Sequence, residues 1–322
     1  MKLGTIGSGV IVLQFLDAAT KVEGVSIVAA YSRTLSIAND LKNKFTMSEA
    51  YDNFEEFIHS NSFDTVYIAS PNSLHFQQAI DCLNANKNVI LEKPFCSNDK
   101  ESQEIINLAI KKGLYLFEAM SINYMPNLEL LKTKLDQIKP IHWIELSMCQ
   151  YSSKFDEFKR GGLPNVFNPA FSGGALMDLN IYHLNFIENL FGIPLKISYH
   201  PMLAKNGIDV SGQILMEYDD FMVSSIAAKN AKGKPFGVIH GEKGIIEFNE
   251  GINGLRSFTL NGENHNIQNE DNRLVYEITT FESIIKNRDF EEMKKQLDIT
   301  QKRMEMLTKI RINSGIYFTA DK

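Results

Sequence analysis

The sequence predicts an α/β protein that begins with a doubly wound parallel sheet and ends with an α+β domain on a mainly antiparallel, open sheet. Three observations lead to this prediction. A glycine-rich turn joins the first apolar strand to a helical pattern, strands and helices alternate up to about residue 120, and consecutive strands dominate the later part. We therefore place one domain at residues 1–120 and a second at residues 121–322.

The first strand, Lys2–Ile6, runs into the turn Gly7-Ser8-Gly9, and apolar residues then recur at helical spacing from Val12. Strand, glycine turn and helix in this order are the context of the dinucleotide-binding motif of the Rossmann fold. Gly7 permits the tight turn, and Gly9 lets the main chain approach a pyrophosphate at the helix N-terminus. Val12 stands where the motif has a third small residue. The dinucleotide contacts expected in this turn are Gly7, Ser8, Gly9, Val10 and Ile11.

The end of the second strand, Val25–Tyr31, predicts the choice of dinucleotide. An NAD site usually has an acidic residue here, which binds the ribose 2′-hydroxyl. This chain has Ser32 and Arg33 instead, a hydrogen-bond donor and a cation that can pair with a 2′-phosphate. NADP(H) is therefore favoured, with NAD(H) as the alternative.

The rest of the first domain continues the alternation of helices and strands. Asn72 or Ser73 is expected to cap the helix that carries Phe76 and Leu83. The other expected elements are helices at Arg33–Phe45, Asn53–Ser60 and Asp99–Lys112, strands at Thr65–Ala69, Val89–Leu91 and Leu114–Phe117, and an exit at Glu118–Met120.

The segment Glu92-Lys93-Pro94 ends the apolar strand that begins at Val89. Proline disfavours helix at the residue before it, so Lys93 is expected to be extended at the end of its strand. Ligands of open α/β sheets bind beyond the carboxyl ends of the strands. Lys93 can there reach a cofactor and a substrate oxygen together.

The second domain shows short strands separated by turns. Val210–Glu217 and Met222–Lys229 flank the Asp219-Asp220 turn and predict a hairpin. The other expected elements are helices at Asn127–Gln137, Arg273–Asn287 and Phe290–Ile312, and strands at Ile141–Met148, Val238–His240, Gly244–Phe248 and Ser257–Leu260.

An apolar helix that opens at Ser172 and ends near Phe191 carries a polar stripe. Asp178 and Tyr182 are four residues apart and share one face, and Asn185 and Asn189 continue this stripe. His183 falls instead on the face expected to join the core. Histidine has the more suitable intrinsic pKa for proton transfer. The geometry nevertheless favours Tyr182, because Asp178 can orient it and a nearby lysine can lower its pKa. Both residues stay candidates for the proton donor.

Composition excludes several classes of function. A net charge of −6 argues against general nucleic-acid binding, which needs a basic face. The three cysteines are widely spaced and form no C-x-x-C pair, which favours a reducing, cytoplasmic setting without structural zinc. No stretch reaches the roughly 18 apolar residues of a membrane span.

Taken together, these motifs resemble the Gfo/Idh/MocA oxidoreductases, the family of glucose–fructose oxidoreductase and inositol dehydrogenase. The resemblance rests on Gly7-Ser8-Gly9, Ser70–His75, Glu92-Lys93-Pro94, Glu118-Ala119-Met120 and Gly173–Asp178. It implies a Rossmann domain followed by a domain whose open sheet mediates homodimers or homotetramers. It also implies that Lys93 lies beside the nicotinamide, with further cofactor contacts at Ser70, Pro71, Asn72, His75 and Glu92.

Within the family, an aspartate four residues before a tyrosine is similar to the branch of dimeric dihydrodiol dehydrogenase and NADP-dependent sugar dehydrogenases. Two departures are expected to alter substrate contacts. The branch usually has an arginine soon after Glu-Ala-Met, where this chain has Ser121-Ile122-Asn123-Tyr124, and Asn180 replaces a small residue. We therefore do not expect this chain to share the substrate of that branch.

The residues favour hydride transfer between a nicotinamide cofactor and a sugar, a polyol or a related small hydroxy or carbonyl compound. Lys93 is expected to bind the substrate oxygen, Tyr182 to exchange its proton and Asp178 to fix the geometry. Two alternatives are a non-catalytic dinucleotide-binding regulator and a glycosidase that recycles its cofactor. A regulator needs neither Lys93 nor the Asp178–Tyr182 stripe.

Overall fold

The computed structural model describes all residues, 1–322, and divides into two compact units. The first contains Met1–Ser121 and Glu270–Met304, and the second contains Ile122–Asn269 and Glu305–Lys322. No helix in the chain is both long enough and apolar enough to cross a bilayer.

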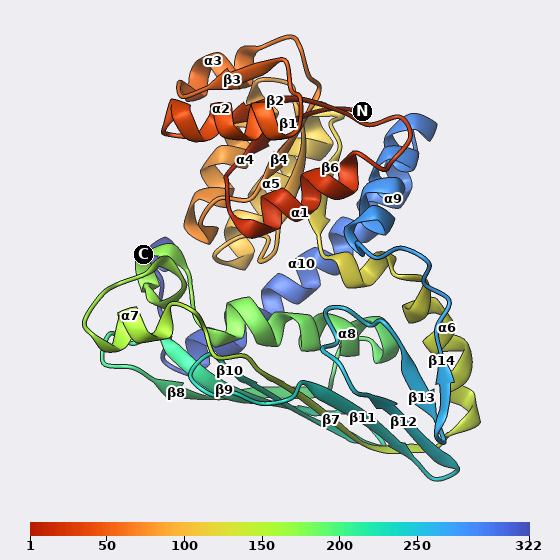
Figure 1. The fold of residues 1–322 in the computed structure, drawn as a ribbon. Helices are drawn as coiled ribbons and strands as arrows, with labels where there is room; N and C mark the ends of the chain where they lie inside the picture. Colours follow the sequence, from red (N-terminus) through yellow and green to blue (C-terminus); the bar gives the residue numbers. More distant parts are fainter. The chain divides into compact units, whose positions relative to one another are not determined.

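The first unit is built on a six-stranded parallel sheet with the order β3-β2-β1-β4-β5-β6 (Figure 1). This is the strand order of the Rossmann fold, in which the order reverses between β1 and β4. Its strands are β1 (Lys2–Ile6), β2 (Ser26–Tyr31), β3 (Glu49–Tyr51), β4 (Thr65–Ile68), β5 (Asn88–Glu92) and β6 (Leu116–Ala119). The three-residue β3 was not expected, because it is too short to show a pattern.

Helices surround this sheet: α1 (Val10–Ala19), α2 (Leu35–Lys44), α3 (Phe54–His59), α4 (His75–Asn84), α5 (Asp99–Lys112) and α9 (Leu274–Asn287). The predicted cap of α4 is wrong. Asn72 and Ser73 lie within a short 3-10 turn, Asn72–Leu74, and Leu74 occupies the cap position without a side-chain hydrogen bond.

The first unit also takes in Glu270–Met304, which the division at residue 120 placed in the second domain. The physical reason is packing against β6. Phe281 of α9 stacks on Phe117 with ring centres 4.6 Å apart, and Met293 accepts a hydrogen bond from the Leu116 N–H. Helical spacing predicts a helix but does not tell which core its apolar face joins.

The second unit is built on an eight-stranded sheet with the order β14-β13-β12-β11-β7-β10-β9-β8. All neighbours pair antiparallel except β7 and β10, which are parallel. The strands are β7 (Ile141–Cys149), β8 (Lys196–Leu203), β9 (Asp209–Glu217), β10 (Met222–Ala228), β11 (Phe236–Gly241), β12 (Gly244–Phe248), β13 (Phe258–Leu260) and β14 (Glu263–His265).

The hairpin of β9 and β10 was expected, whereas β8 and β14 were not. α8 (Ile181–Phe191) lies along one face of this sheet, and the opposite face carries no helix (Figure 1). The remaining helices are α6 (Pro126–Lys134), α7 (Phe155–Lys159) and α10 (Phe290–Asn313), whose first residues up to Met304 belong to the first unit.

Candidate active site

The loop after β1 has the form that a dinucleotide requires. Gly7 has a φ of +115°, and a Cβ at this position would lie 2.6 Å from the Ala69 carbonyl oxygen, so only glycine fits. A Cβ on Gly9 would meet no atom within 4 Å, which leaves open space in front of the first turn of α1. Gly9 is the cap residue of α1 and supplies no capping side chain. The main-chain N–H groups of this turn therefore suit a phosphate.

Val12, the departure from the motif, is fully buried. Its side chain lies 3.3 Å from the point where a Cβ on Gly7 would be, so the missing side chain of Gly7 makes room for it. The glycine turn and the larger helix residue are thus compatible. Ser8 and Val10 are exposed, and Ile11 is half-buried.

Ser32 and Arg33 leave the carboxyl end of the neighbouring strand β2. The Ser32 N–H donates to the Tyr51 carbonyl, and its hydroxyl accepts a hydrogen bond from the Thr34 N–H. Arg33 is exposed, so its guanidinium is accessible to an anion in solution. The structure therefore places both residues at the strand end where the ribose of a dinucleotide is bound in this fold.

Lys93 follows β5 directly, and the Lys93–Pro94 peptide bond is cis. The Lys93 N–H donates to the Glu92 carboxylate at 3.2 Å, and the Tyr67 hydroxyl donates to the same carboxylate at 2.6 Å. Tyr67 in turn stacks on Phe15. The main chain on the N-terminal side of Lys93 is therefore held by a buried network, while the lysine itself is half-buried.

His75 holds the other side of this loop. Its two ring nitrogens lie 3.0 Å from the carbonyl oxygens of Pro94 and Ser70, so the imidazole ties the end of β4 to the end of β5. Burial lowers the pKa of His75, and these carbonyl contacts oppose the shift. A neutral imidazole has one N–H and donates to one of these carbonyls at a time.

The predicted cofactor contacts thus fall into two groups. Ser70, Pro71 and Asn72 are half-buried on the loop after β4. Glu92 and His75 are buried, and their observed partners are protein groups. These two side chains shape the loops around Lys93. Their direct contact with a cofactor stays a prediction.

In the second unit, a π-helical turn, Leu176–Asn180, precedes α8 and carries Asp178. The sequence pattern predicts an ordinary α-helix here, and the structure differs from it by this turn. The turn is anchored by Asp209, which is fully enclosed and accepts hydrogen bonds from the Leu176 N–H and the Tyr199 hydroxyl, both at 2.6 Å. π-helical turns inside helices occur frequently at functional sites.

Sequence reasoning missed Lys229, which follows β10 and forms an ion pair with Asp178. Lys229 is only 4% exposed, and its ammonium also lies 5.8 Å from the centre of the Phe167 ring. A lysine at the end of an apolar strand can be buried, and a buried ammonium needs a carboxylate or another polar partner. The position of Lys229 was therefore the one sequence signal that could have indicated an ion pair here. Its carboxylate partner could not be identified without the fold.

His183 occupies the core position that its helix face predicted. Its Nδ1 lies 2.8 Å from the Ser225 hydroxyl, which donates to the Asn180 side-chain oxygen, so Nδ1 carries the proton. Burial lowers the pKa of His183 to about 3. The side chain is fully enclosed, and this contradicts its candidacy as the catalytic proton donor.

The expected effect of Asn180 on substrate contacts is also corrected, because Asn180 is fully buried and hydrogen-bonded within this core. The second departure from the family branch is the stretch 121–124, which stands where the branch has an arginine. Within it, the Asn123 side-chain oxygen accepts hydrogen bonds from Asn185 at 2.6 Å and Asn189 at 3.0 Å. Asn123 therefore joins the polar stripe of α8.

Tyr182 is half-buried and packs against a small apolar cluster of Met148, Leu179 and Ala227.

Comparisons with known proteins match both parts of the chain. Residues 1–120 match the family model described as "Oxidoreductase family, NAD-binding Rossmann fold", and residues 140–247 match the "GFO/IDH/MocA C-terminal domain". A scyllo-inositol 2-dehydrogenase (NADP(+)), IolU of Bacillus subtilis, is 32% identical over 100% of this chain and 99% of its own length. A mouse trans-1,2-dihydrobenzene-1,2-diol dehydrogenase is 26% identical over 82% of this chain and 78% of its own length.

Among solved structures, KijD10 of Actinomadura kijaniata, a 3-ketoreductase in complex with NADP and TDP-benzene, superposes with a TM-score of 0.86. The two chains are 17% identical, and the match covers 97% of each. At this identity the likeness shows a common fold.

Proposed function

Because the chain belongs to the Gfo/Idh/MocA oxidoreductase family, we propose that it is an NADP(H)-dependent dehydrogenase of a polyol or sugar, with Lys93 and Tyr182 as its catalytic residues. The family assignment makes it an NAD(P)-dependent oxidoreductase. The choice of NADP(H) is supported by Ser32 and Arg33 after β2 and by the full-length relative named as an NADP(+) enzyme.

The observation that carries the proposal is the way Lys93 is presented at the carboxyl end of β5. Glu92 and Tyr67 fix the chain before it, and His75 binds the Pro94 carbonyl after it. A catalytic group must be held by its surroundings to act in one geometry. The glycine turn with open space before α1 supplies the phosphate site in the same sheet.

In the proposed reaction, a bound nicotinamide would supply the hydride chemistry at the carbinol carbon of the substrate, and the protein positions that carbon and moves one proton. Lys93 donates a hydrogen bond to the reacting oxygen and stabilises its developing negative charge. Tyr182 takes the hydroxyl proton in oxidation and returns it in reduction. The Asp178–Lys229 ion pair positions the π-helical turn beside Tyr182.

The substrate class is a small ring-shaped polyol or sugar. The relative that spans the whole chain is named for scyllo-inositol, and we carry that class, but not that compound, to this protein. The three cysteines are free, and we place the reaction in the reducing cytoplasm. We further propose that the open face of the eight-stranded sheet forms a homodimer or homotetramer.

A screen of cyclitols, alditols and aldoses with NADP⁺ and with NAD⁺, followed by nicotinamide absorbance, tests this proposal. We expect net NADPH formation with at least one free polyol. Lys93→Ala should reduce kcat by about 10²-fold or more while NADP⁺ binding, measured by fluorescence titration, changes little. The exposed Lys100→Ala in α5 serves as the control. The absence of turnover with every compound, or full activity of Lys93→Ala, would contradict the proposal.

A further inference from the structure

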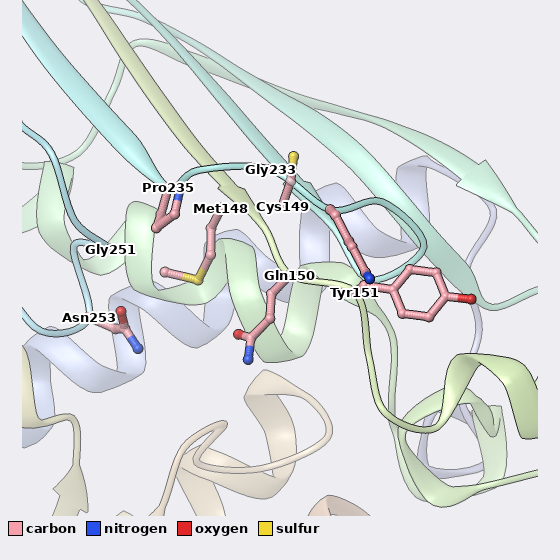
Figure 2. A pocket seen from close by; sticks show the side chains of 9 residues that line it. Met148, Cys149, Gln150, Tyr151, Gly233, Pro235, Gly251 and Asn253 are labelled. Carbon is pink, nitrogen blue, oxygen red and sulfur yellow. The ribbon is translucent and has the colours of Figure 1, made fainter.

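The second unit contains a cavity of about 460 Å³ where β7 ends and two loops approach it. This volume is in the range of small-molecule sites, roughly 300–1,000 Å³. Its lining includes Met148 and Gln150 from the end of β7, Lys232 and Pro235 from the loop before β11, and Gly251 and Asn253 from the loop after β12. Figure 2 shows the Met148 thioether between the parts of the chain that carry Gln150 and Asn253.

The cavity is connected to the candidate catalytic residue by direct packing. Met148, which lines it, belongs to the apolar cluster against which Tyr182 packs. The cavity wall is also joined to the strand that carries Lys229. The Gln150 N–H donates to the Ala228 carbonyl, and the Ser152 N–H donates to the Lys229 carbonyl, both at 2.8 Å.

The loops around the cavity are held closely. The Gly233 N–H donates to the Cys149 carbonyl at 3.0 Å, and a Cβ on Gly233 would lie 2.9 Å from the Cys149 Cβ. This glycine therefore allows the loop before β11 to approach the end of β7. On the other side, a Cβ on Gly251 would lie 2.5 Å from the side-chain oxygen of Asn253.

The lining chemistry matches a polyhydroxylated ring. The side chains of Gln150 and Asn253 make no hydrogen bond within the protein, and each carboxamide can both donate and accept, as a hydroxyl group requires. Met148 and Pro235 offer apolar surface to the C–H groups of a ring. Lys232 adds one ammonium donor, and no acidic residue lines the cavity to attract a cationic ligand.

We propose that this cavity binds the hydroxyl groups of the substrate's ring, and that Gln150 and Asn253 determine which polyol is accepted. The inference rests on the proposed function and extends it to specificity. Gln150 is exposed and Asn253 is half-buried, so both carboxamides are open to a ligand. A hydroxyl that fits is hydrogen-bonded by them, whereas a stereoisomer with that hydroxyl displaced loses this hydrogen bond and binds more weakly.

The test compares steady-state kinetics with NADP⁺ for the wild type and variants, on the polyol that the screen above finds to be oxidised best and on an epimer of that polyol; scyllo-inositol and myo-inositol are one such pair. Gln150→Ala and Asn253→Ala should each raise the KM for the preferred isomer about 5- to 10-fold, corresponding to one lost hydrogen bond. The kcat and the KM for NADP⁺ should stay within about twofold. The preference between the two isomers should shrink. Gln137→Ala, exposed elsewhere in the same unit, is the matched control.

A glycine pair provides a second measurement without removing any polar group. Gly251→Ala places a methyl group against the Asn253 carboxamide and should raise the same KM, whereas Gly254→Ala meets only ordinary contacts, the nearest at 3.6 Å. Unchanged KM values in Gln150→Ala and Asn253→Ala, or equal effects of the two glycine variants, would overturn the inference while leaving the proposed function intact. Failure of the wild type to oxidise any polyol would overturn both.

Discussion

Tyr182 and His183 are adjacent in the chain, yet their environments differ. Tyr182 is half-buried at the edge of an apolar cluster, whereas His183 is fully enclosed and hydrogen-bonded to Ser225. Proton exchange with a substrate requires a group that the substrate can reach. We therefore propose Tyr182, the more accessible residue, as the proton donor, although the intrinsic pKa favours the histidine.

Substitutions at these two positions should affect different properties: catalysis at Tyr182 and stability at His183. Tyr182→Phe should lower kcat by about 10²- to 10⁴-fold, because it removes the hydroxyl that exchanges the proton. His183→Asn should lower the free energy of unfolding by about 1–3 kcal/mol, while the folded variant keeps most of its kcat. Steady-state kinetics and urea denaturation measure the two effects. A larger loss of kcat in His183→Asn would reject Tyr182 as the proton donor.

Glu277 of α9 is a buried acid in the first unit. Neither of its carboxyl oxygens has a hydrogen-bond partner, and the side chain is fully enclosed. Burial raises the pKa of Glu277 well above its usual range, nearby Glu92 and Glu118 reinforce the shift, and Arg273 opposes it. The folded state therefore retains a proton that the unfolded chain releases above its ordinary pKa of about 4.3.

This difference makes stability fall as the pH rises. From about pH 4.3 up to the raised pKa, Glu277 should cost the folded state up to about 1.4 kcal/mol per pH unit. Glu277→Gln removes this titration, so the free energy of unfolding of the variant, relative to that of the wild type, should increase as the pH rises above 5. Urea midpoints across this range test the effect, with the exposed Glu104→Gln as control. Parallel pH profiles for Glu277→Gln and the wild type would contradict it.

At the scale of secondary-structure elements, the parallel register of the first sheet aligns the loops of the proposed cofactor site. Ile6 pairs with both Tyr31 and Ile68, and Ile68 pairs with Leu91. The glycine turn, Ser32-Arg33, the loop after β4 and Lys93 therefore leave the sheet at the same edge. A parallel sheet converts residues distant in sequence into neighbours at the ends of its strands.

Arg33 at the end of β2 should discriminate between the two dinucleotides. Arg33→Ala should raise the KM for NADP⁺ by about 10- to 100-fold, because a charge-assisted contact with the 2′-phosphate contributes about 1.5–3 kcal/mol. The KM for NAD⁺, which has no 2′-phosphate, should change less than about twofold. Kinetics with both dinucleotides test this, and Lys100→Ala controls for the loss of a surface charge. Equal losses with both dinucleotides would show that Arg33 does not read the 2′-phosphate.

At the scale of the whole molecule, the open face of the eight-stranded sheet exposes apolar side chains. Met222 and Ile226 alternate along β10 with the buried Val223 and Ala227, so they belong to the face opposite α8. Phe236 of β11 is also exposed, at 41%. Exposed apolar surface of this kind favours association with a second surface.

We expect Ile226→Glu to shift the protein towards monomers, because it places a charge in the centre of the proposed interface. Size-exclusion chromatography with multi-angle light scattering measures the change. Ile110→Glu in α5, a similarly exposed isoleucine in the first unit, is the control. A wild type that is monomeric at micromolar concentration would contradict the proposed homo-oligomer.

The sequence alone determined the class of both sheets, the glycine turn, the lysine after β5 and the core position of His183. These features depend on local patterns, because strand alternation, helix spacing and the conformational needs of glycine and proline act over a few residues. The family motifs added the cofactor and the type of reaction.

Only the tertiary structure decided which distant groups meet. It paired Lys229 with Asp178, anchored the π-helical turn on Asp209, and added α9 to the first unit. It also brought Gln150 and Asn253 to one cavity. The pairing of buried charges and the sharing of a core are settled by packing between segments far apart in the chain, and no local pattern encodes which segment a side chain meets.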